Sequence, residues 1–328
     1  MFETLTYSAI FIVSAGAFYF SGELIVRSLI KIAKILQWKE FAISFVIMAI
    51  VASLPNLFVG IISAINKIPQ LAFGDVIGGN VVDLTLSVAL AALFAKKGIP
   101  AKSRTVQSTL IFTSAAAVFP VLLAWDGVLS RIDGIILISF YVFYLAWLFS
   151  KRERFSKTCE ENGNIKKKKS GKIQYSLINV LQVLACVAVF IIAAQGIVSS
   201  AQYFAATFNW SLILIGLFIV GVGNCAPEIF FAIASARQGK RGHDWMILGD
   251  LMGAIIGPAT FVLGTVALIT PIQISDFSPF AVARIFLIFA IICFFTFVRN
   301  DQRISKKEAA FLLMIYVAFV ITEIFVKL

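Results

Sequence analysis

Histidine is almost absent from this 328-residue chain, and its few cysteines show no paired spacing. The only histidine, His243, falls in a predicted loop, so the sequence contains no serine–histidine or histidine–glutamate motif of an enzyme. The four cysteines, Cys159, Cys186, Cys225 and Cys293, stand far apart in the sequence. We therefore expect that the protein is not an enzyme and that it has neither a disulfide framework nor a cysteine–histidine metal cluster.

Apolar residues, in contrast, are abundant: 60% of the chain is hydrophobic, and the mean hydropathy is +0.96. A soluble protein of this length could not keep so much apolar surface from water, so the composition predicts an all-α integral membrane protein. A spanning helix needs about 20 apolar residues. Ten runs qualify, at 7–30, 41–65, 71–95, 105–124, 132–150, 176–198, 209–235, 245–269, 279–298 and 309–327. The first lacks a preceding basic segment and is too long for a signal peptide, so we expect it to be retained.

The net charge of +11 could indicate a nucleic-acid partner, but the positions of the basic residues favour a lipid bilayer instead. Lys and Arg concentrate in every second connection between the spans, as the positive-inside rule requires. The longest basic connection is the segment 151–175. We therefore expect a multi-pass protein of the plasma membrane, with both termini outside and residues 151–175 in the cytoplasm.

The segment 151–175 divides the chain into two halves of five spans, 1–150 and 176–328, and the halves resemble each other. The stretch "LPNLFVGIISA" matches "APEIFFAIASA", and "FGDVIGGNVV" matches "LGDLMGAIIG". Because each half has an odd number of spans, the second must be inverted relative to the first. Inverted repeats with matching irregular helices are typical of secondary transporters whose substrate site lies near mid-membrane.

Each half contains a proline inside an apolar run, and we expect both to interrupt a helix. Pro55 would leave the carbonyl of Val51 without its helical donor, and Pro227 would do the same for Gly223. A bound cation could satisfy these carbonyls in the membrane. The alternative interpretation is an ordinary proline kink that neighbouring helices satisfy.

Four acidic residues also lie inside apolar runs: Asp75, Asp83, Glu228 and Asp250. Such residues usually face a cavity or a transport pathway. Asp75 and Asp83 share one helix face because they are separated by two steps of four residues. Hard cations such as Ca²⁺ prefer carboxylate, amide and carbonyl oxygens, which these segments contain. For Asp75 and Asp250 a helix cap or an interfacial position is the alternative.

Glycines recur at intervals of four residues in the third and eighth predicted spans. Small residues at this interval allow two helices to approach closely. We therefore expect close packing around the glycines Gly74, Gly78, Gly249, Gly253 and Gly257.

The segments 51–83 and 221–258 resemble the two α-repeats of the calcium/cation antiporter superfamily, which contains the sodium/calcium exchangers. The family pattern is roughly Gly-Thr-Ser-Leu-Pro-Glu followed by Gly-Asn-x-x-Gly-Ser-Asn. The sequences "VASLPNLFVG" and "FGDVIGGNVVD" correspond to it in the first repeat, and "GVGNCAPEIFFA" and "LGDLMGAIIGP" in the second. The resemblance covers nearly the whole chain and implies ten helices in two inverted repeats.

Several positions depart from the family pattern. The paired glutamates of the family fall on Asn56 and Glu228, so only the second is present. The acid or amide that closes the motif falls on Asp83 in the first repeat and on Pro258 in the second. The family's hydroxyl positions fall on Ala52, Ser53, Asn224, Cys225, Gly79 and Ala254. Asp75 and Asp250 stand where the family has asparagine.

The resemblance implies a secondary active cation antiporter that works by alternating access and needs no cofactor. Its transported cations would be Ca²⁺ and Na⁺. The departures leave open an antiporter for another cation, a proton-coupled exchanger, or a transport-inactive scaffold, and the oligomeric state is also open. The candidate cation ligands are Glu228, Asp83, Asn56, Ser53, Asn224, Cys225, Asp75 and Asp250, with the carbonyls of Val51 and Gly223.

Overall fold

The computed structural model describes the backbone of residues 2–35, 40–102, 104–150, 174–238, 244–274, 277–300 and 302–327. Within these ranges some side chains, including those of residues 40–52 and 174–180, are not described. The predicted basic segment 151–175 therefore lies outside the described residues, except for its last two, which begin a helix.

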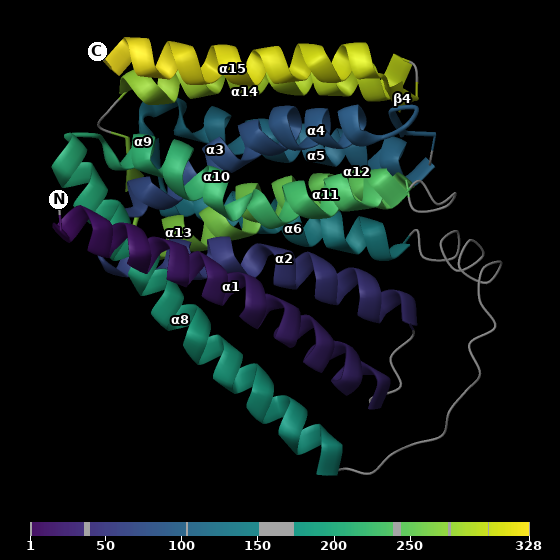
Figure 1. Cartoon of the computed structure of the whole chain (residues 1–328), viewed down its shortest axis with the longest axis horizontal. Coiled ribbons are helices and arrows are strands. Elements are labelled where there is room, and N and C mark those ends of the chain that lie inside the picture. Colours follow the sequence, from purple (N-terminus) through teal and green to yellow (C-terminus); the bar gives the residue numbers. More distant parts are fainter. Residues whose placement is uncertain are drawn as a thin grey trace.

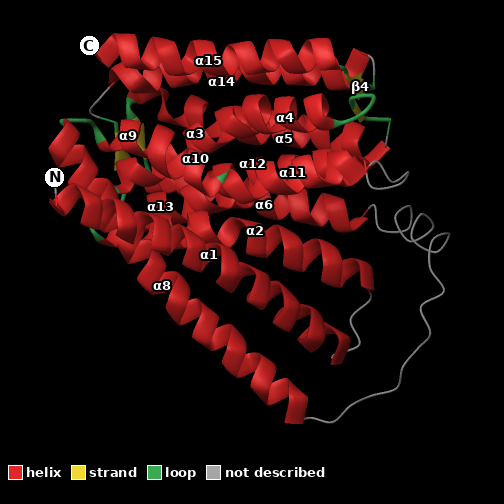
Figure 2. Ribbon diagram, in the orientation of Figure 1, coloured by secondary structure: helices red, strands yellow, loops and turns green. Residues whose placement is uncertain are grey.

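Helices make up almost all of the described chain, and four two-residue strands connect some of them (Figure 2). The helices of the first half are α1 (Phe2–Ile35), α2 (Glu40–Ile65), α3 (Pro69–Val82), α4 (Val88–Phe94), α5 (Arg104–Leu123) and α6 (Arg131–Ser150). Those of the second half are α8 (Gln174–Phe208), α9 (Leu212–Ile215), α10 (Gly221–Asn224), α11 (Ala226–Gln238), α12 (Asp244–Ile256), α13 (Leu263–Ile269), α14 (Phe277–Asn300) and α15 (Lys306–Lys327). Short irregular helices are η1 (Asp83–Ser87), η2 (Ala124–Asp126), η3 (Gly216–Val220) and η4 (Gly257–Val262).

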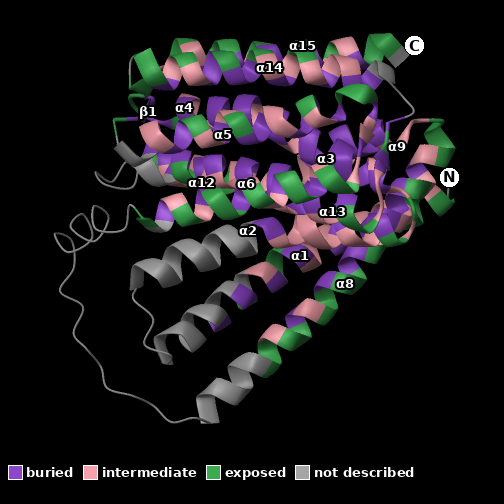
Figure 3. Ribbon diagram, turned by 180° about the vertical axis from the view of Figure 1, so that it is seen from behind, coloured by how far each residue is buried: buried purple, intermediate pink, exposed green. Residues whose placement is uncertain are grey.

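The predicted all-α membrane architecture is confirmed. Among the described residues, nine helical stretches are long and apolar enough to cross a membrane. The remaining predicted span, 41–65, corresponds to α2, of which Ser53–Ile65 is a shorter apolar helix by the same measure. Figure 3 shows exposed residues along the outer helices and an almost fully buried α3 at the centre. The exposed outer residues include many large apolar side chains, as a surface that faces lipid requires.

The helices α1 and α8 lie side by side along one edge of the bundle, and both contact α2 (Figure 1). Aromatic pairs join them: the rings of Tyr7 and Tyr203 stack at 4.2 Å, and those of Phe18 and Phe190 lie 4.9 Å apart. The central helix α3 packs instead against α9, η3 and α10. The first half of the chain therefore contacts the second half both at the edge of the bundle and at its centre.

Two antiparallel strand pairs link the halves in an inverted arrangement. Strand β1 (Ile99–Pro100) follows α4 and pairs with β4 (Arg303–Ile304), which precedes α15. Strand β2 (Val128–Leu129) precedes α6 and pairs with β3 (Ile272–Gln273), which follows α13. Exchanging the two halves converts one pair into the other, and the pairs lie at opposite ends of the bundle (Figure 2). This arrangement agrees with the inverted repeats that the sequence predicts.

The helices that follow β2 and β4 begin with the same capping box. The Ser130 amide donates to the Asp133 carboxylate, and the Asp133 amide donates back to the Ser130 hydroxyl. The Ser305 amide and the Glu308 carboxylate repeat this exchange at the start of α15. Such reciprocal bonds satisfy the free N–H groups of a helix start. The two halves therefore also agree in local chemistry.

One expectation about helix continuity is wrong. Pro55 lies inside the uninterrupted helix α2, so the predicted break does not occur in the first repeat. A proline removes a single hydrogen bond of the helical ladder, and the turns on either side keep theirs. Irregularity lies elsewhere, in π-helical segments that the sequence analysis did not anticipate. Two of them lie at corresponding places: η1 begins at Asp83, and η4 begins at Gly257, one residue before Pro258, the counterpart of Asp83.

Glycines permit close backbone contact between α3 and the second repeat. A Cβ atom on Gly74 would overlap the backbone of Ile213, and one on Gly78 would overlap that of Leu217. The predicted close packing is confirmed here. In the second repeat it is confirmed at Gly257, where a Cβ would overlap the Ser53 hydroxyl, but not at Gly249 or Gly253. Among the described residues, no atom lies within 4 Å of a Cβ built on either of these two.

This difference between the repeats predicts unequal effects of the same substitution. Gly78→Ala should lower the thermal midpoint of the purified protein, because overpacking costs about 1–3 kcal/mol. Gly253→Ala is the matched control and should leave the midpoint the same or higher, since alanine is the better helix former. Thermal unfolding in detergent measures both. Equal midpoints for the two variants would contradict the close contact at Gly78.

Candidate functional site

The helix break of the second repeat lies at Cys225, between α10 and α11. Cys225 keeps helical torsion angles, with φ −82° and ψ −6°, and its carbonyl accepts from the Ile229 amide at 3.0 Å. Pro227 follows in the first turn of α11, where a missing N–H is tolerated. Since Pro227 has no N–H, the Gly223 carbonyl lacks its helical donor, as predicted. The interruption itself begins two residues earlier than Pro227.

The Cys225 side chain points from this break to the first repeat. Its Sγ lies 3.5 Å from the carbonyl oxygen of Gly79, and its thiol also hydrogen-bonds to the Asp83 carboxylate. Gly79 matters for this contact because a Cβ there would lie 3.3 Å from the sulfur. The break in one repeat is therefore held against α3 and η1 of the other.

Asp83 is the first residue of the π-helical segment η1 and is 3% exposed. Its carboxylate accepts a hydrogen bond of 2.9 Å from the Ser87 hydroxyl. Single π-helical turns within α-helices are frequent at functional sites. Ser87 was not among the predicted site residues, although its position four residues after Asp83 was a usable signal.

Glu228 stands in the first turn of α11, close enough to Asp83 and Asp250 to interact with both electrostatically. Its Oε2 atom is buried and has no hydrogen-bond partner in the described part of the chain. The same holds for Nδ2 of Asn80, which is 2% exposed. A buried carboxylate oxygen such as Oε2 of Glu228 is costly unless a hydrogen-bond donor or a cation meets it.

No basic side chain balances these acids among the described residues. The groups that act electrostatically on Asp83 and Glu228 are each other and Asp250. Buried carboxylates in a membrane are normally paired or face an ion pathway. The arrangement can therefore accept a cation or protons.

Asp75 is buried, and its carboxylate is bound by Asn224 of the second repeat. The Nδ2 atom of Asn224 lies 3.0 Å from both carboxylate oxygens. Asp75 and Asp250 both lie beyond the first turn of their helices, α3 and α12, so the helix-cap alternative is wrong for both. Asp250 is half-buried and forms no hydrogen bond within the described residues.

The remaining predicted ligands come from α2. Ser53 is 4% exposed and lies against Gly257, since a Cβ on that glycine would overlap the serine hydroxyl. Asn56 is half-buried and makes no hydrogen bond in the described structure. Val51 lies in α2, where Pro55 leaves its carbonyl without a helical donor; its side chain lies outside the described residues.

Side chains alone do not complete a cation site in this conformation. Among the described residues, no three Cys, His, Asp or Glu side chains are close enough to hold one ion together. Ca²⁺ takes six to eight oxygen ligands, many of them carbonyls, amides or water. Amide, hydroxyl and backbone oxygens would therefore have to supply much of any coordination shell.

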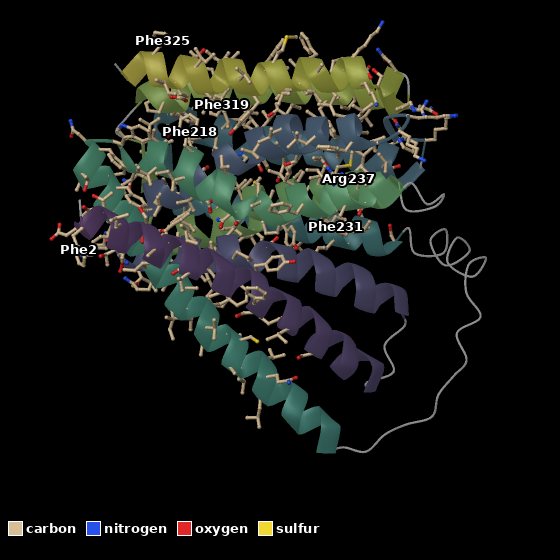
Figure 4. All side chains as sticks on the ribbon, viewed as in Figure 1. Phe2, Phe218, Phe231, Arg237, Phe319 and Phe325 are labelled. Carbon is tan, nitrogen blue, oxygen red and sulfur yellow. The ribbon has the colours of Figure 1, made fainter. Side chains whose placement is uncertain are left out.

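One buried acid was missed by the sequence analysis. Glu323 of α15 is 1% exposed inside an apolar helix. One turn earlier Phe319 packs on Phe218 of η3, with ring centroids 5.4 Å apart (Figure 4). A lone acid in an apolar run was the available signal. Because Glu323 lies near the end of the chain, the sequence did not indicate that its side chain is buried.

Comparisons with known proteins agree with this architecture. The family model described as sodium/calcium exchanger protein matches residues 6–150 and 178–325. The sodium/calcium exchanger MaX1 of Methanosarcina acetivorans is 24% identical, over 99% of each chain. The inner membrane protein YrbG of Escherichia coli is 26% identical, over 76% of this chain and 77% of its own.

The fold has a solved counterpart. A structure of the sodium-calcium exchanger NCX_Mj matches with a TM-score of 0.62 and 19% identity, over 97% of this chain and 98% of the other. The described helices, the inverted strand pairs and the family match lead to the same result. The chain belongs to the sodium/calcium exchanger protein family, and it is a membrane cation antiporter that resembles the Na⁺/Ca²⁺ exchangers.

Proposed function

We propose that Asp83 and Glu228 bind the transported cation near mid-membrane, between the two repeats. The observation that carries this proposal is the proximity of two acids from opposite halves without a basic partner in the described chain. Each acid lies at a helix irregularity, where backbone carbonyls are available to a ligand. Asn56 and Ser53 and the carbonyls of Val51 and Gly223 are proposed to complete the coordination shell.

The proposed cargo is Ca²⁺ in exchange for Na⁺. MaX1 is named a sodium/calcium exchanger, and some structures of NCX_Mj were obtained after soaking in Na⁺ with Ca²⁺ or Sr²⁺. Asn56 weakens the case for a divalent ion, because an amide offers one oxygen and no charge where the family has glutamate. Exchange of another cation, or exchange coupled to protons, is therefore the second candidate.

Transport is proposed to follow alternating access, with α1 and α8 moving together against the central helices. Their mutual packing through stacked aromatic rings supports this, because it makes the two helices one unit at the edge of the bundle. The process needs no cofactor and no covalent chemistry, so we propose that the protein is not an enzyme.

The proposed location is the plasma membrane, with both termini outside and the basic segment 151–175 in the cytoplasm. The alternation of basic and non-basic connections along the sequence supports this orientation. The bilayer and inorganic cations are the proposed partners, and no nucleic acid is involved.

Replacing either central acid should abolish most exchange. Glu228→Gln and Asp83→Asn keep the shape of the side chain but remove its charge, so each should reduce Na⁺-driven Ca²⁺ uptake into proteoliposomes by about tenfold or more. Glu308→Gln is the control, because an amide can still cap α15 and the residue lies away from the site. Its uptake should equal that of the unmodified protein.

The same variants distinguish the alternatives. Unchanged uptake in Glu228→Gln would show that the site assignment is wrong. If the unmodified protein moves no Ca²⁺, uptake driven by K⁺ or H⁺ gradients tests the other antiporters. If no cation binds in calorimetry, the chain is a transport-inactive scaffold.

Restoring the missing family glutamate should change ion preference. Asn56→Glu adds a negative charge and a second oxygen, both of which favour divalent over monovalent ions. We expect a lower KM for Ca²⁺ relative to the unmodified protein, measured in the same proteoliposomes. Asn56→Gln, which adds length without charge, should leave KM near its original value. An equal KM for both variants would place residue 56 outside the coordination shell.

A further inference from the structure

Two aspartates occupy matched positions in the repeats, yet they have different surroundings. Asp75 in α3 and Asp250 in α12 each follow a glycine and precede a second glycine by three residues. Asp75 is 1% exposed and accepts two hydrogen bonds from Asn224. Asp250 is half-buried and accepts none within the described residues.

The partner of Asp75 comes from the break in the second repeat. Asn224 is the last residue of α10 and directly precedes Cys225. Its single amide nitrogen bridges the two oxygens of Asp75 at 3.0 Å each. Breaking a hydrogen bond between buried groups is costly, because both partners are then left unsatisfied. The contact therefore ties the end of α10 to α3.

The backbone around this contact leaves little room for movement. A Cβ on Gly221 would lie 3.0 Å from the Gly79 amide and 3.1 Å from the Asp75 carbonyl. One on Gly216 would lie 2.7 Å from the Asp75 amide. Close contact between backbones thus brings α10 alongside α3, and the Asp75–Asn224 pair sets how far along α3 it lies.

The second repeat has no counterpart of this pair. In the matched motifs Pro55 corresponds to Pro227, so Ala52 occupies the place of Asn224. Alanine has no polar side-chain atom and cannot bind Asp250. The glycines beside Asp250 also lack described neighbours, whereas those beside Asp75 are in close contact.

We propose that Asp75 and Asn224 are a positioning pair, which holds the break at Cys225 in place and does not coordinate the cation. This inference rests on the proposed site at Asp83 and Glu228. The Nδ2 atom of Asn224 lies against both oxygens of Asp75, so this nitrogen and the carboxylate already have partners in each other. Directly after the pair, Cys225 contacts Asp83, and Glu228 follows one turn later. Loss of the pair would release the segment that carries Glu228.

Three variants separate positioning from coordination. Asn224→Ala removes the bond and leaves Asp75 buried without it, so Na⁺-driven Ca²⁺ uptake should fall about tenfold or more. Asp75→Asn removes the charge but retains an oxygen that can accept from Asn224, so it should lose about threefold or less. The exchanged pair Asp75→Asn with Asn224→Asp restores a charged hydrogen bond in the opposite sense and should recover uptake relative to Asn224→Ala. In each variant, any loss of uptake relative to the unmodified protein should appear as a lower kcat more than as a changed KM for Ca²⁺.

Thermal unfolding provides a control that is independent of transport. Asp75→Ala should lower the melting temperature more than Asp250→Ala, because only Asp75 is hydrogen-bonded in the described structure. If Asn224→Ala does not fold, the exchanged pair decides: recovered folding and uptake support the proposal, and a folded but inactive protein overturns it. Uptake in Asp75→Asn as low as in Asn224→Ala would also overturn it, as would unchanged uptake in Asn224→Ala. If Glu228→Gln leaves uptake unchanged, the proposed cation site is wrong. The comparison of the melting temperatures of Asp75→Ala and Asp250→Ala still tests the Asp75–Asn224 pair in that case.

Discussion

Two carboxylates from opposite halves of the chain lie close together without a basic partner among the described residues, and the rest of the structure depends on this arrangement. Asp83 and Glu228 would repel each other if both were charged and no cation were present. Burial in an apolar bundle makes the repulsion stronger, because the surroundings screen charge poorly. The fold therefore has to hold the two groups in place while it leaves them able to accept positive charge. In a cation antiporter this is the property that transport requires.

The helix irregularities follow from the same requirement. Asp83 begins a π-helical segment, and Glu228 follows the break at Cys225. At both points the regular helical ladder changes, and in the proposed site backbone oxygens there would contribute to the coordination shell. Close contact between glycine backbones then brings α3 of the first repeat against η3 and α10 of the second. Each irregular segment is consequently supported by a regular helix from the other half.

The repeats agree in their scaffold and differ at the site. The strand pairs and capping boxes are the same in both halves. The site is different: the first repeat has Asn56 and Asp83 where the second has Glu228 and Pro258. Asp75 has a partner in Asn224, whereas the side chain of Asp250 has no hydrogen-bond partner among the described residues. A two-fold scaffold thus encloses the proposed site, which takes one acid from each half but from different motif positions.

The sequence was sufficient for the membrane architecture, for nine of the ten predicted spans among the described residues and for the correspondence between the halves, because hydropathy and repeated motifs depend only on local composition. It also pointed to Asp83, Glu228 and the Gly223 carbonyl without its helical donor, since an acid or a proline in an apolar run is visible without a structure. It was wrong about a break at Pro55, where the helix absorbs the loss of one hydrogen bond. It did not reveal the π-helical segments, the burial of Glu323 or the bond between Asp75 and Asn224. These features depend on which helices of the two halves pack together. Contacts between residues that are far apart in the chain cannot be recognised from the local sequence around either residue.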